Sequence, residues 1–341
     1  MIKYPYRGQK YADPAGWLTR HPKPFLWAML RDMIRVRLVE LEIERRYKED
    51  EMKTPIHLVI GQEACAVGCA AALRPPDLVY AGHRNHGIYL AKGGDLKSMM
   101  AELYCRSTGC VGSRGGSMHL IDKKAGMAWT SAIVAGSIPI AAGAALAAQM
   151  KKEDRVIVAF FGDAANEEGV TSETLNFSVL KHLPLVFFSE NNFYSVQSSL
   201  EGRQPSVEIH RRAAGFRPAG GSGGWNNVVA VFEAMSRAVE RAREGRGPTF
   251  IEARTYRWRA HGGAGDDSPS GYRDPAEVEA WRAVCPIEGF EEALRSAGVF
   301  SKGQRAEWDQ EIHREIQDAF EFARQSPEPS AADAFTHVYA E

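Results

Sequence analysis

The feature that most limits the fold of this chain is an alternation of short apolar runs and longer segments with helical periodicity, beginning near residue 78. Residues 155–161 are almost all apolar, as expected for a strand that helices cover on both faces. A helical pattern spans residues 168–181, and Pro184 precedes a second apolar run over residues 185–189. This order is typical of a parallel sheet. The sequence therefore predicts an α/β fold with a mostly parallel sheet and helices on both faces.

Helical segments are expected at both ends of this α/β core. Residues 24–50 carry apolar residues at helical spacing before Pro55, which indicates one long amphipathic helix. After residue 275 the chain reads as charged helices. Two glycine-rich stretches, residues 220–224 and 262–265, have the composition of flexible loops. We predict three parts: an N-terminal arm and helix (1–50), the α/β domain (51–275) and C-terminal helices packed on that domain (276–341).

The composition excludes several classes of function. The 341 residues include 42 basic and 43 acidic side chains, a net charge of −1, so we expect no patch that would hold a nucleic-acid backbone. Residues 1–17 lack the apolar core of a signal peptide, and no run of 18 apolar residues follows. We therefore expect no nucleic-acid partner, no membrane association and a cytoplasmic location.

The cysteines do not indicate a disulfide framework. There are five, an odd number, and they form no CxxC pair. Cys65 and Cys69 are one helical turn apart and could share a metal ion. The alanine-rich sequence around them favours two thiols in the core instead.

Polar residues follow the predicted strands at the point where each strand ends. Asp163 comes directly after the first buried strand and Asn192 after the next. The carboxyl ends of parallel strands meet at one edge of a sheet, so both side chains should face one crevice. Carboxylate and amide oxygens suit Mg²⁺ or Ca²⁺, and Mg²⁺ usually shares its coordination with phosphate. Taken singly, Asp163 is better explained as a helix cap and Asn192 as part of a turn.

Taken together, these residues resemble a known cofactor signature. The chain reads Gly162-Asp163-Ala164, then 26 residues, then Asn191-Asn192. This is similar to the thiamine-diphosphate signature, in which Gly-Asp-Gly precedes Asn-Asn at that spacing. The departure is Ala164, which matters only if the position requires a positive φ or has no space for a Cβ.

The resemblance extends over roughly residues 30 to 290. It is to the alpha subunit of the thiamine-diphosphate-dependent first component of 2-oxo acid dehydrogenases, of the pyruvate, branched-chain and acetoin types. The matching blocks are residues 56–64 (IHLVIGQEA), 83–87 (HRNHG), 115–119 (GGSMH), 162–169, 190–194 (ENNFY) and 255–261 (TYRWRAH). The implied fold is the thiamine-diphosphate-binding α/β fold.

The resemblance also implies roles for individual residues. Metal ligands would be Asp163, Asn192 and the backbone carbonyl of Tyr194. The groups around the cofactor would be His83, Arg84, Ala132, Val134, Ala164, Ala165, Arg257 and His261, in addition to the metal ligands. His57 and His261 would be the catalytic histidines, although His57 could instead be a buried core histidine. His86 and His119 could serve only to hydrogen-bond loops. Ala132 and Ala135 stand where many relatives have glycine.

The implied function is that of an enzyme subunit. With thiamine diphosphate and Mg²⁺, it would decarboxylate a 2-oxo acid and transfer the acyl group to a lipoyl carrier. A lipoyl-bearing acyltransferase would then be a further partner. A beta-type subunit would supply the glutamate that activates the cofactor, in an α2β2 assembly. One alternative is an alpha-type subunit of a two-chain non-oxidative carboligase or decarboxylase. Another is a cofactor-free structural or regulatory subunit.

Overall fold

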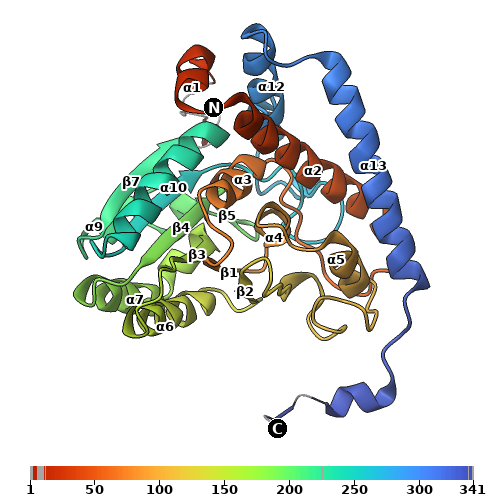
Figure 1. Cartoon of the computed structure of the whole chain (residues 1–341), viewed down its shortest axis with the longest axis horizontal. Coiled ribbons are helices and arrows are strands. Elements are labelled where there is room, and N and C mark those ends of the chain that lie inside the picture. The colour runs from red at the N-terminus through yellow and green to blue at the C-terminus, as the bar shows by residue number, and fades with distance from the viewer. Residues whose placement is uncertain (1–2, 6–10, 12, 225, 337, 340–341) are drawn as a thin grey trace.

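The computed structural model describes residues 3–5, 11, 13–224, 226–336 and 338–339. Within these ranges, six parallel strands form the central sheet, in the order β2-β1-β3-β4-β8-β7 (Figure 1). The strands are Leu78–Ala81 (β1), Met127–Thr130 (β2), Ile157–Gly162 (β3), Leu185–Asn191 (β4), Ala219–Gly224 (β7) and Thr249–Arg254 (β8). A separate antiparallel pair joins Tyr194–Ser195 (β5) to Ser198–Ser199 (β6). The predicted parallel α/β sheet is confirmed.

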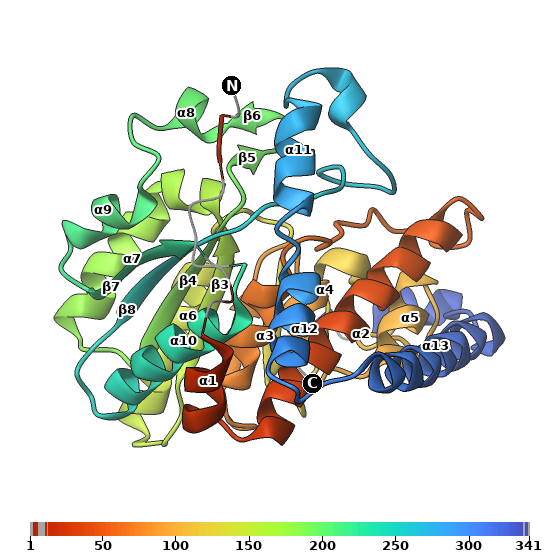
Figure 2. The same cartoon turned by 90° about the horizontal axis from the view of Figure 1, so that it is seen from above.

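Helices cover both faces of the sheet, as predicted (Figure 2). Helices α6 (Ser137–Met150) and α7 (Gly169–Leu180) lie on one face, and α3 (Glu63–Ala71) and α10 (Val228–Arg243) lie on the other. Every residue of β4 is buried, and so are the first five residues of β3. Strands buried on both faces need no polar alternation, which is why both read as unbroken apolar runs.

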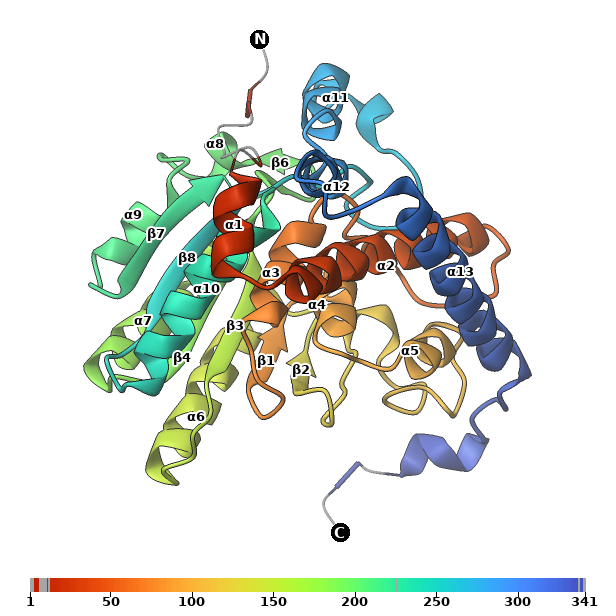
Figure 3. The same ribbon diagram turned by 45° about the horizontal axis from the view of Figure 1, so that its top comes forward.

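The remaining helices surround this core (Figure 3). The long helix α2 (Lys23–Tyr47) matches the predicted N-terminal helix, and the C-terminal helix α13 (Lys302–Gln325) packs on α2 and on α5 (Leu96–Leu103). The division into parts 1–50, 51–275 and 276–341 stays a prediction. The other helices are Pro14–Arg20 (α1), His86–Ala91 (α4), Leu200–Arg203 (α8), Ile209–Ala214 (α9), Pro275–Arg282 (α11) and Pro286–Ser296 (α12), with 3₁₀ turns at Gly116–Met118, Asp163–Glu167, Ser268–Ser270 and Ala331–Phe335.

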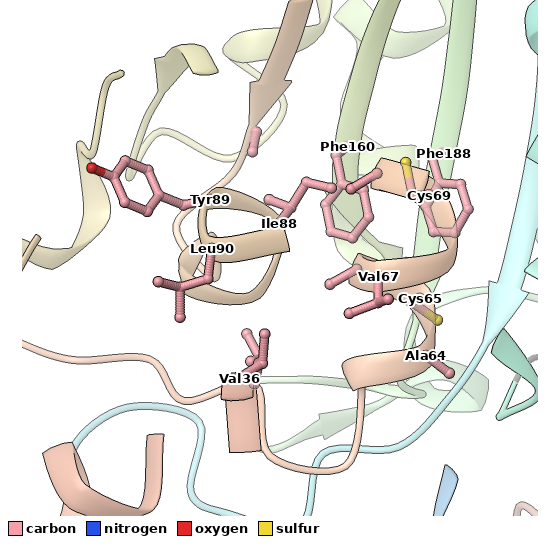
Figure 4. Close-up of a cluster of buried hydrophobic side chains, with 14 of the residues drawn as sticks. Val36, Ala64, Cys65, Val67, Cys69, Ile88, Tyr89, Leu90, Phe160 and Phe188 are labelled. Atoms are coloured by element: carbon pink, nitrogen blue, oxygen red, sulfur yellow. The ribbon is translucent and has the colours of Figure 1, made fainter. Parts of the chain in front are cut away.

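The two cysteines of α3 belong to the hydrophobic core. Cys65 and Cys69 are fully buried, near Phe160 of β3 and Phe188 of β4, whose rings stack 5.0 Å apart (Figure 4). Burial raises the pKa of both thiols well above its usual range, so neither is a thiolate near neutral pH. Core packing, rather than metal binding, explains this pair.

One expectation about the glycine-rich stretches was wrong. Residues 220–224, expected to be a flexible loop, form most of the edge strand β7, which pairs with β8. Gly220 has φ +126°, and a Cβ at that position would lie 1.8 Å from the backbone oxygen of Phe250. The strand therefore requires glycine where the two backbones approach closely.

Among the described residues, none of the helices combines the length and the apolar composition needed to cross a membrane.

Candidate active site

The ends of β1, β3 and β4 meet at one edge of the sheet and open into a cavity of about 210 Å³. This edge is where parallel α/β sheets bind ligands. Eleven predicted site residues line the cavity: His57, His83, Arg84, Ala132, Val134, Asp163, Ala164, Ala165, Asn192, Tyr194 and His261. The segments that carry them are far apart in the sequence, so the fold brings the predicted site together.

Two of the three predicted metal ligands, Asn192 and Tyr194, are held by buried hydrogen bonds. The amide nitrogen of Asn192 donates to Gln62 Oε1 (3.1 Å), and Asn192 Oδ1 accepts from the backbone N–H of Tyr194 (3.3 Å). The Tyr194 hydroxyl donates to Glu277 of α11 (2.9 Å), which anchors the Tyr194 side chain. The side chain of Asp163 is only 3% exposed. Asp163 and Asn192 thus line the cavity, and neighbouring groups hold their side chains in place.

Arg203 is a residue of this site that the sequence did not indicate. Its guanidinium, at the end of α8, forms ion pairs with both Asp163 and Glu167. Burial raises the pKa of Asp163, and the charge of Arg203 acts against that shift. A buried carboxylate that needs a cation is therefore balanced here by a side chain. Arg203 follows none of the strands of the central sheet and lies in no recognisable motif, so only the tertiary structure could place it.

Three histidines form a second group in the same cavity. The rings of His57, His83 and His261 lie 4.7 to 5.4 Å apart, measured between centroids. Burial, followed by the charge of Arg84, lowers their pKa values to about 2, 3 and 4 respectively. All three imidazoles are therefore neutral near pH 7.

The two arginines predicted to lie near a diphosphate have different positions. Arg84 lines the cavity, and its guanidinium donates to the backbone oxygens of Leu58 (2.6 Å) and His261 (2.7 Å). Arg257 is not among the lining residues; it donates to the backbone oxygen of Val196 (2.7 Å), which does line the cavity. Arg257 thus supports the wall from behind, and only Arg84 faces the cavity.

His86 and His119 belong to the framework around the cavity. His86 bridges Glu40 (2.7 Å) and Ser117 (2.7 Å), and all three residues are fully buried. His119 Nδ1 contacts the backbone oxygen of Thr130 (3.2 Å). Their hydrogen bonds fit the loop-holding role considered for them.

Glu190 and Gln62 are two further residues that sequence reasoning passed over. Glu190 lines the cavity, and burial raises its pKa to about 8, so it is largely protonated near neutral pH. Gln62 supports Asn192, and its Nε2 is buried without a hydrogen-bond partner. Both lie in the blocks quoted above, each of which also contains residues that were assigned roles, so the signal for them was position within a motif.

The alanines that replace family glycines differ in backbone conformation. Ala164 lies outside the left-handed region, so a Cβ is tolerated there, whereas Ala135 has φ +62°. An L-residue in that region costs about 1 kcal/mol or more.

We therefore expect Ala135→Gly to raise the free energy of unfolding by about 1 kcal/mol, measured by urea denaturation. Ala132→Gly is the matched control and should lower the free energy of unfolding. A stabilising effect of the same size at both positions would contradict this explanation.

The chemistry of the site fits a divalent metal and a phosphate ligand. Asp163, Asn192 and the carbonyl of Tyr194 offer hard oxygen donors, the set that Mg²⁺ prefers. Gly82 and Gly162 also line the cavity, and a Cβ at either would meet no protein atom within 4 Å. The strand ends thus leave open space beside the oxygen donors, where a ligand can approach the backbone closely.

A parallel α/β sheet with hard oxygen donors grouped at its ligand-binding edge fits the class of enzymes that use a divalent metal and a phosphate-bearing cofactor. Comparison with known families is more specific. The family model described as "Dehydrogenase E1 component" matches residues 31–332. The chain belongs to this family.

Curated relatives agree over nearly the whole chain. The alpha subunit of acetoin:2,6-dichlorophenolindophenol oxidoreductase from Bacillus subtilis (strain 168) is 36% identical, covering 92% of this chain and 93% of the relative. The pyruvate dehydrogenase E1 component subunit alpha of Porphyra purpurea is 34% identical, covering 95% and 94%. The somatic mitochondrial form from Homo sapiens is 33% identical, covering 91% and 78%. The resemblance drawn from the motifs, and the oxidoreductase function it implied, are confirmed; the carboligase alternative is not favoured.

Proposed function

We propose that this chain is the alpha subunit of a thiamine-diphosphate-dependent 2-oxo acid dehydrogenase of the pyruvate or acetoin type. It would decarboxylate a 2-oxo acid and pass the acyl group to a lipoyl carrier on an acyltransferase, and it would act in the cytoplasm. The observation that carries the proposal is the meeting of Asp163, Asn192 and Tyr194 at one cavity, in a member of the E1 component family.

Residues of this chain would hold the metal and the diphosphate. Asp163 and Asn192 would bind Mg²⁺ through side-chain oxygens and Tyr194 through its carbonyl, after Arg203 has moved off the Asp163 carboxylate. Arg84, buried in the cavity wall, would offset the negative charge of the diphosphate. Thiamine diphosphate supplies the carbon nucleophile and the electron sink of the reaction. Because His57 and His261 are neutral near pH 7, each ring can donate a hydrogen bond to a bound substrate through one nitrogen and accept one through the other.

An exposed apolar face next to the cavity supports a beta-type partner, in an α2β2 assembly. On α6, Ile140, Gly143, Ala147 and Met150 are exposed at helical spacing. Phe177 and Leu180 are exposed on α7, which lies beside α6 (Figure 1). Patches of this kind usually mark protein interfaces. Val134, which lines the cavity and is 46% exposed, comes just before α6 in the chain, so a subunit that covered the start of α6 would also reach the cavity.

The apolar face gives a test of assembly. Ile140→Glu should abolish co-purification with the beta-type chain, because a carboxylate would be buried without a partner at the contact. Light scattering coupled to size-exclusion chromatography measures the loss. Arg314→Glu, on the exposed side of α13, is the matched control and should leave the assembly intact. Full assembly of the Ile140 variant would show that the partner binds elsewhere.

Activity of the reconstituted enzyme tests the function itself. With both chains, thiamine diphosphate and Mg²⁺, a 2-oxo acid should drive the reduction of 2,6-dichlorophenolindophenol. The alpha chain alone should give none, because the activating glutamate belongs to the partner. Acyloin formation from a 2-oxo acid and an aldehyde, without dye reduction, would favour the carboligase alternative. Full turnover by the single chain would overturn the proposal.

A further inference from the structure

The N-terminal segment of the chain contacts the residues that carry two of the predicted metal ligands. Residues 3–5 lie beside β5 and β6 (Figure 2). The ring of Tyr4 stacks on that of Phe193, with centroids 4.5 Å apart, and meets the ring of Tyr194 edge-on at 5.7 Å. All three residues are buried. Tyr4 is far from both neighbours in the sequence, so the fold alone creates this contact.

Hydrogen bonds fix Tyr4 at this position. Its backbone N–H donates to Glu277 Oε2 (3.0 Å), and its backbone oxygen accepts from the indole N–H of Trp281 (2.7 Å). Its hydroxyl oxygen accepts from the backbone N–H of Glu201 in α8 (3.0 Å). Glu277 is also the acceptor for the Tyr194 hydroxyl (2.9 Å). Tyr4 and Tyr194 are thus anchored to the same carboxylate of α11, while α8 holds the hydroxyl end of Tyr4.

The segment between β4 and β5 has a backbone conformation that needs such support. Phe193 has φ +69°, in the left-handed region that disfavours a residue with a Cβ. A backbone of this kind persists only where surrounding contacts hold it. Phe193 contacts the rings of Tyr4 (4.5 Å, nearly parallel) and Trp281 (5.9 Å, tilted), so Tyr4 provides the closer of the two. Loss of the Tyr4 ring would uncover one face of Phe193.

The predicted metal site depends on the conformation of this segment. A backbone carbonyl has no side-chain torsions, so the position of the Tyr194 carbonyl is set by the backbone alone. Asn192 lies directly before Phe193, and its amide oxygen accepts from the Tyr194 N–H (3.3 Å). Two of the three predicted metal ligands would therefore shift together if the segment changed its conformation.

On the basis of the function put forward above, we propose that Tyr4 is a positioning residue for the metal. It holds Phe193 in place and thereby keeps the Asn192 amide and the Tyr194 carbonyl in the arrangement that binds Mg²⁺. Tyr4 is not among the residues that line the cavity, so it acts through its neighbours and not on the cofactor or the substrate. Its loss should weaken Mg²⁺ binding and leave the chemical step unchanged.

Mg²⁺ binding to the assembled enzyme tests this role. Mg²⁺ is titrated calorimetrically into the assembly of alpha and beta-type chains with excess thiamine diphosphate, and kcat is measured with both at saturation. Tyr4→Ala should weaken Mg²⁺ binding by about tenfold or more, while kcat at saturation stays close to that of the wild type. Tyr4→Phe keeps the stacked ring and should retain the wild-type affinity. Tyr4→Leu keeps an apolar side chain without the ring and should behave like Tyr4→Ala, and melting curves establish that each variant is folded.

Tyr11→Ala is the matched control. Tyr11 stacks on Phe290 of α12 (5.1 Å) and meets Trp17 of α1 edge-on, so this variant removes the same side chain at another contact of the N-terminal region. Its Mg²⁺ affinity should match that of the wild type. In a Phe193→Ala background, Tyr4→Ala should have little further effect, because the two residues act through one contact.

Equal Mg²⁺ affinity in the wild type and in Tyr4→Ala would overturn this role for Tyr4. A loss in Tyr4→Ala that Tyr4→Phe shares in full, or that Tyr11→Ala reproduces, would overturn it as well. A wild-type assembly that binds no thiamine diphosphate would instead overturn the proposed function, and the role of Tyr4 with it.

Discussion

Replacing Asp163 by asparagine is expected to weaken Mg²⁺-dependent binding of thiamine diphosphate by about 100-fold or more and to abolish activity in the assembled enzyme. The substitution keeps the shape of the side chain but removes the one negative charge among the three predicted metal ligands. It also leaves the Arg203 guanidinium without one of its two carboxylate partners beside the metal position. Calorimetric titration of the cofactor, with and without Mg²⁺, measures the effect.

Glu167→Gln is the matched control for this prediction. Glu167 contacts the same guanidinium of Arg203, but it is not among the residues that line the cavity. Its substitution removes the same charge and should change cofactor affinity by only a few-fold. Equal losses in the two variants would mean that the pairing with Arg203, and not metal binding, is what Asp163 contributes.

A second large effect is expected at Glu102, on the buried side of α5. Its carboxylate is fully buried and accepts four backbone N–H groups, from Val111, Ser113, Gly115 and Gly116, at 2.8 to 3.2 Å. In Glu102→Gln, an NH₂ group faces two of these donors. Each charged hydrogen bond contributes about 1.5 to 3 kcal/mol, so we expect a loss of about 3 to 5 kcal/mol, measured by urea denaturation.

The same variant should also impair the cavity. Met118 lines it and follows directly on the loop that Glu102 holds, so we expect a weaker affinity for the cofactor in the assembled enzyme. The control is Glu173→Gln on the exposed side of α7, which should change stability by less than about 0.5 kcal/mol. A Glu102 variant as stable as this control would show that solvent or another group satisfies the four N–H donors.

The placement of Asp163 and Asn192 could be predicted because two physical rules agree. Strands covered on both faces are continuous apolar runs, so β3 and β4 are visible in the sequence. The structure pairs them in register, with Gly162 opposite Glu190, so the residues that follow both strands emerge side by side. A local pattern combined with sheet topology was enough to place one edge of the site.

The position of Arg203 and the extended conformation of β7 could not be predicted from the local sequence. Arg203 meets Asp163 only because the chain turns back after β6, and no periodicity encodes that contact. Strand β7 is mostly glycine, so it carries no apolar signal, and its extended conformation comes from pairing with β8. In both cases a tertiary neighbour, and not the local sequence, decides the structure.

A crystal structure of this chain with its beta-type partner, thiamine diphosphate and Mn²⁺ in place of Mg²⁺ tests the central claim most directly. Mn²⁺ accepts the same oxygen ligands, and its anomalous scattering locates it. We predict a single peak in each alpha chain, within coordination distance of the Asp163 carboxylate, the Asn192 amide oxygen and the Tyr194 carbonyl. Cofactor density without a peak beside Asp163 would contradict the account.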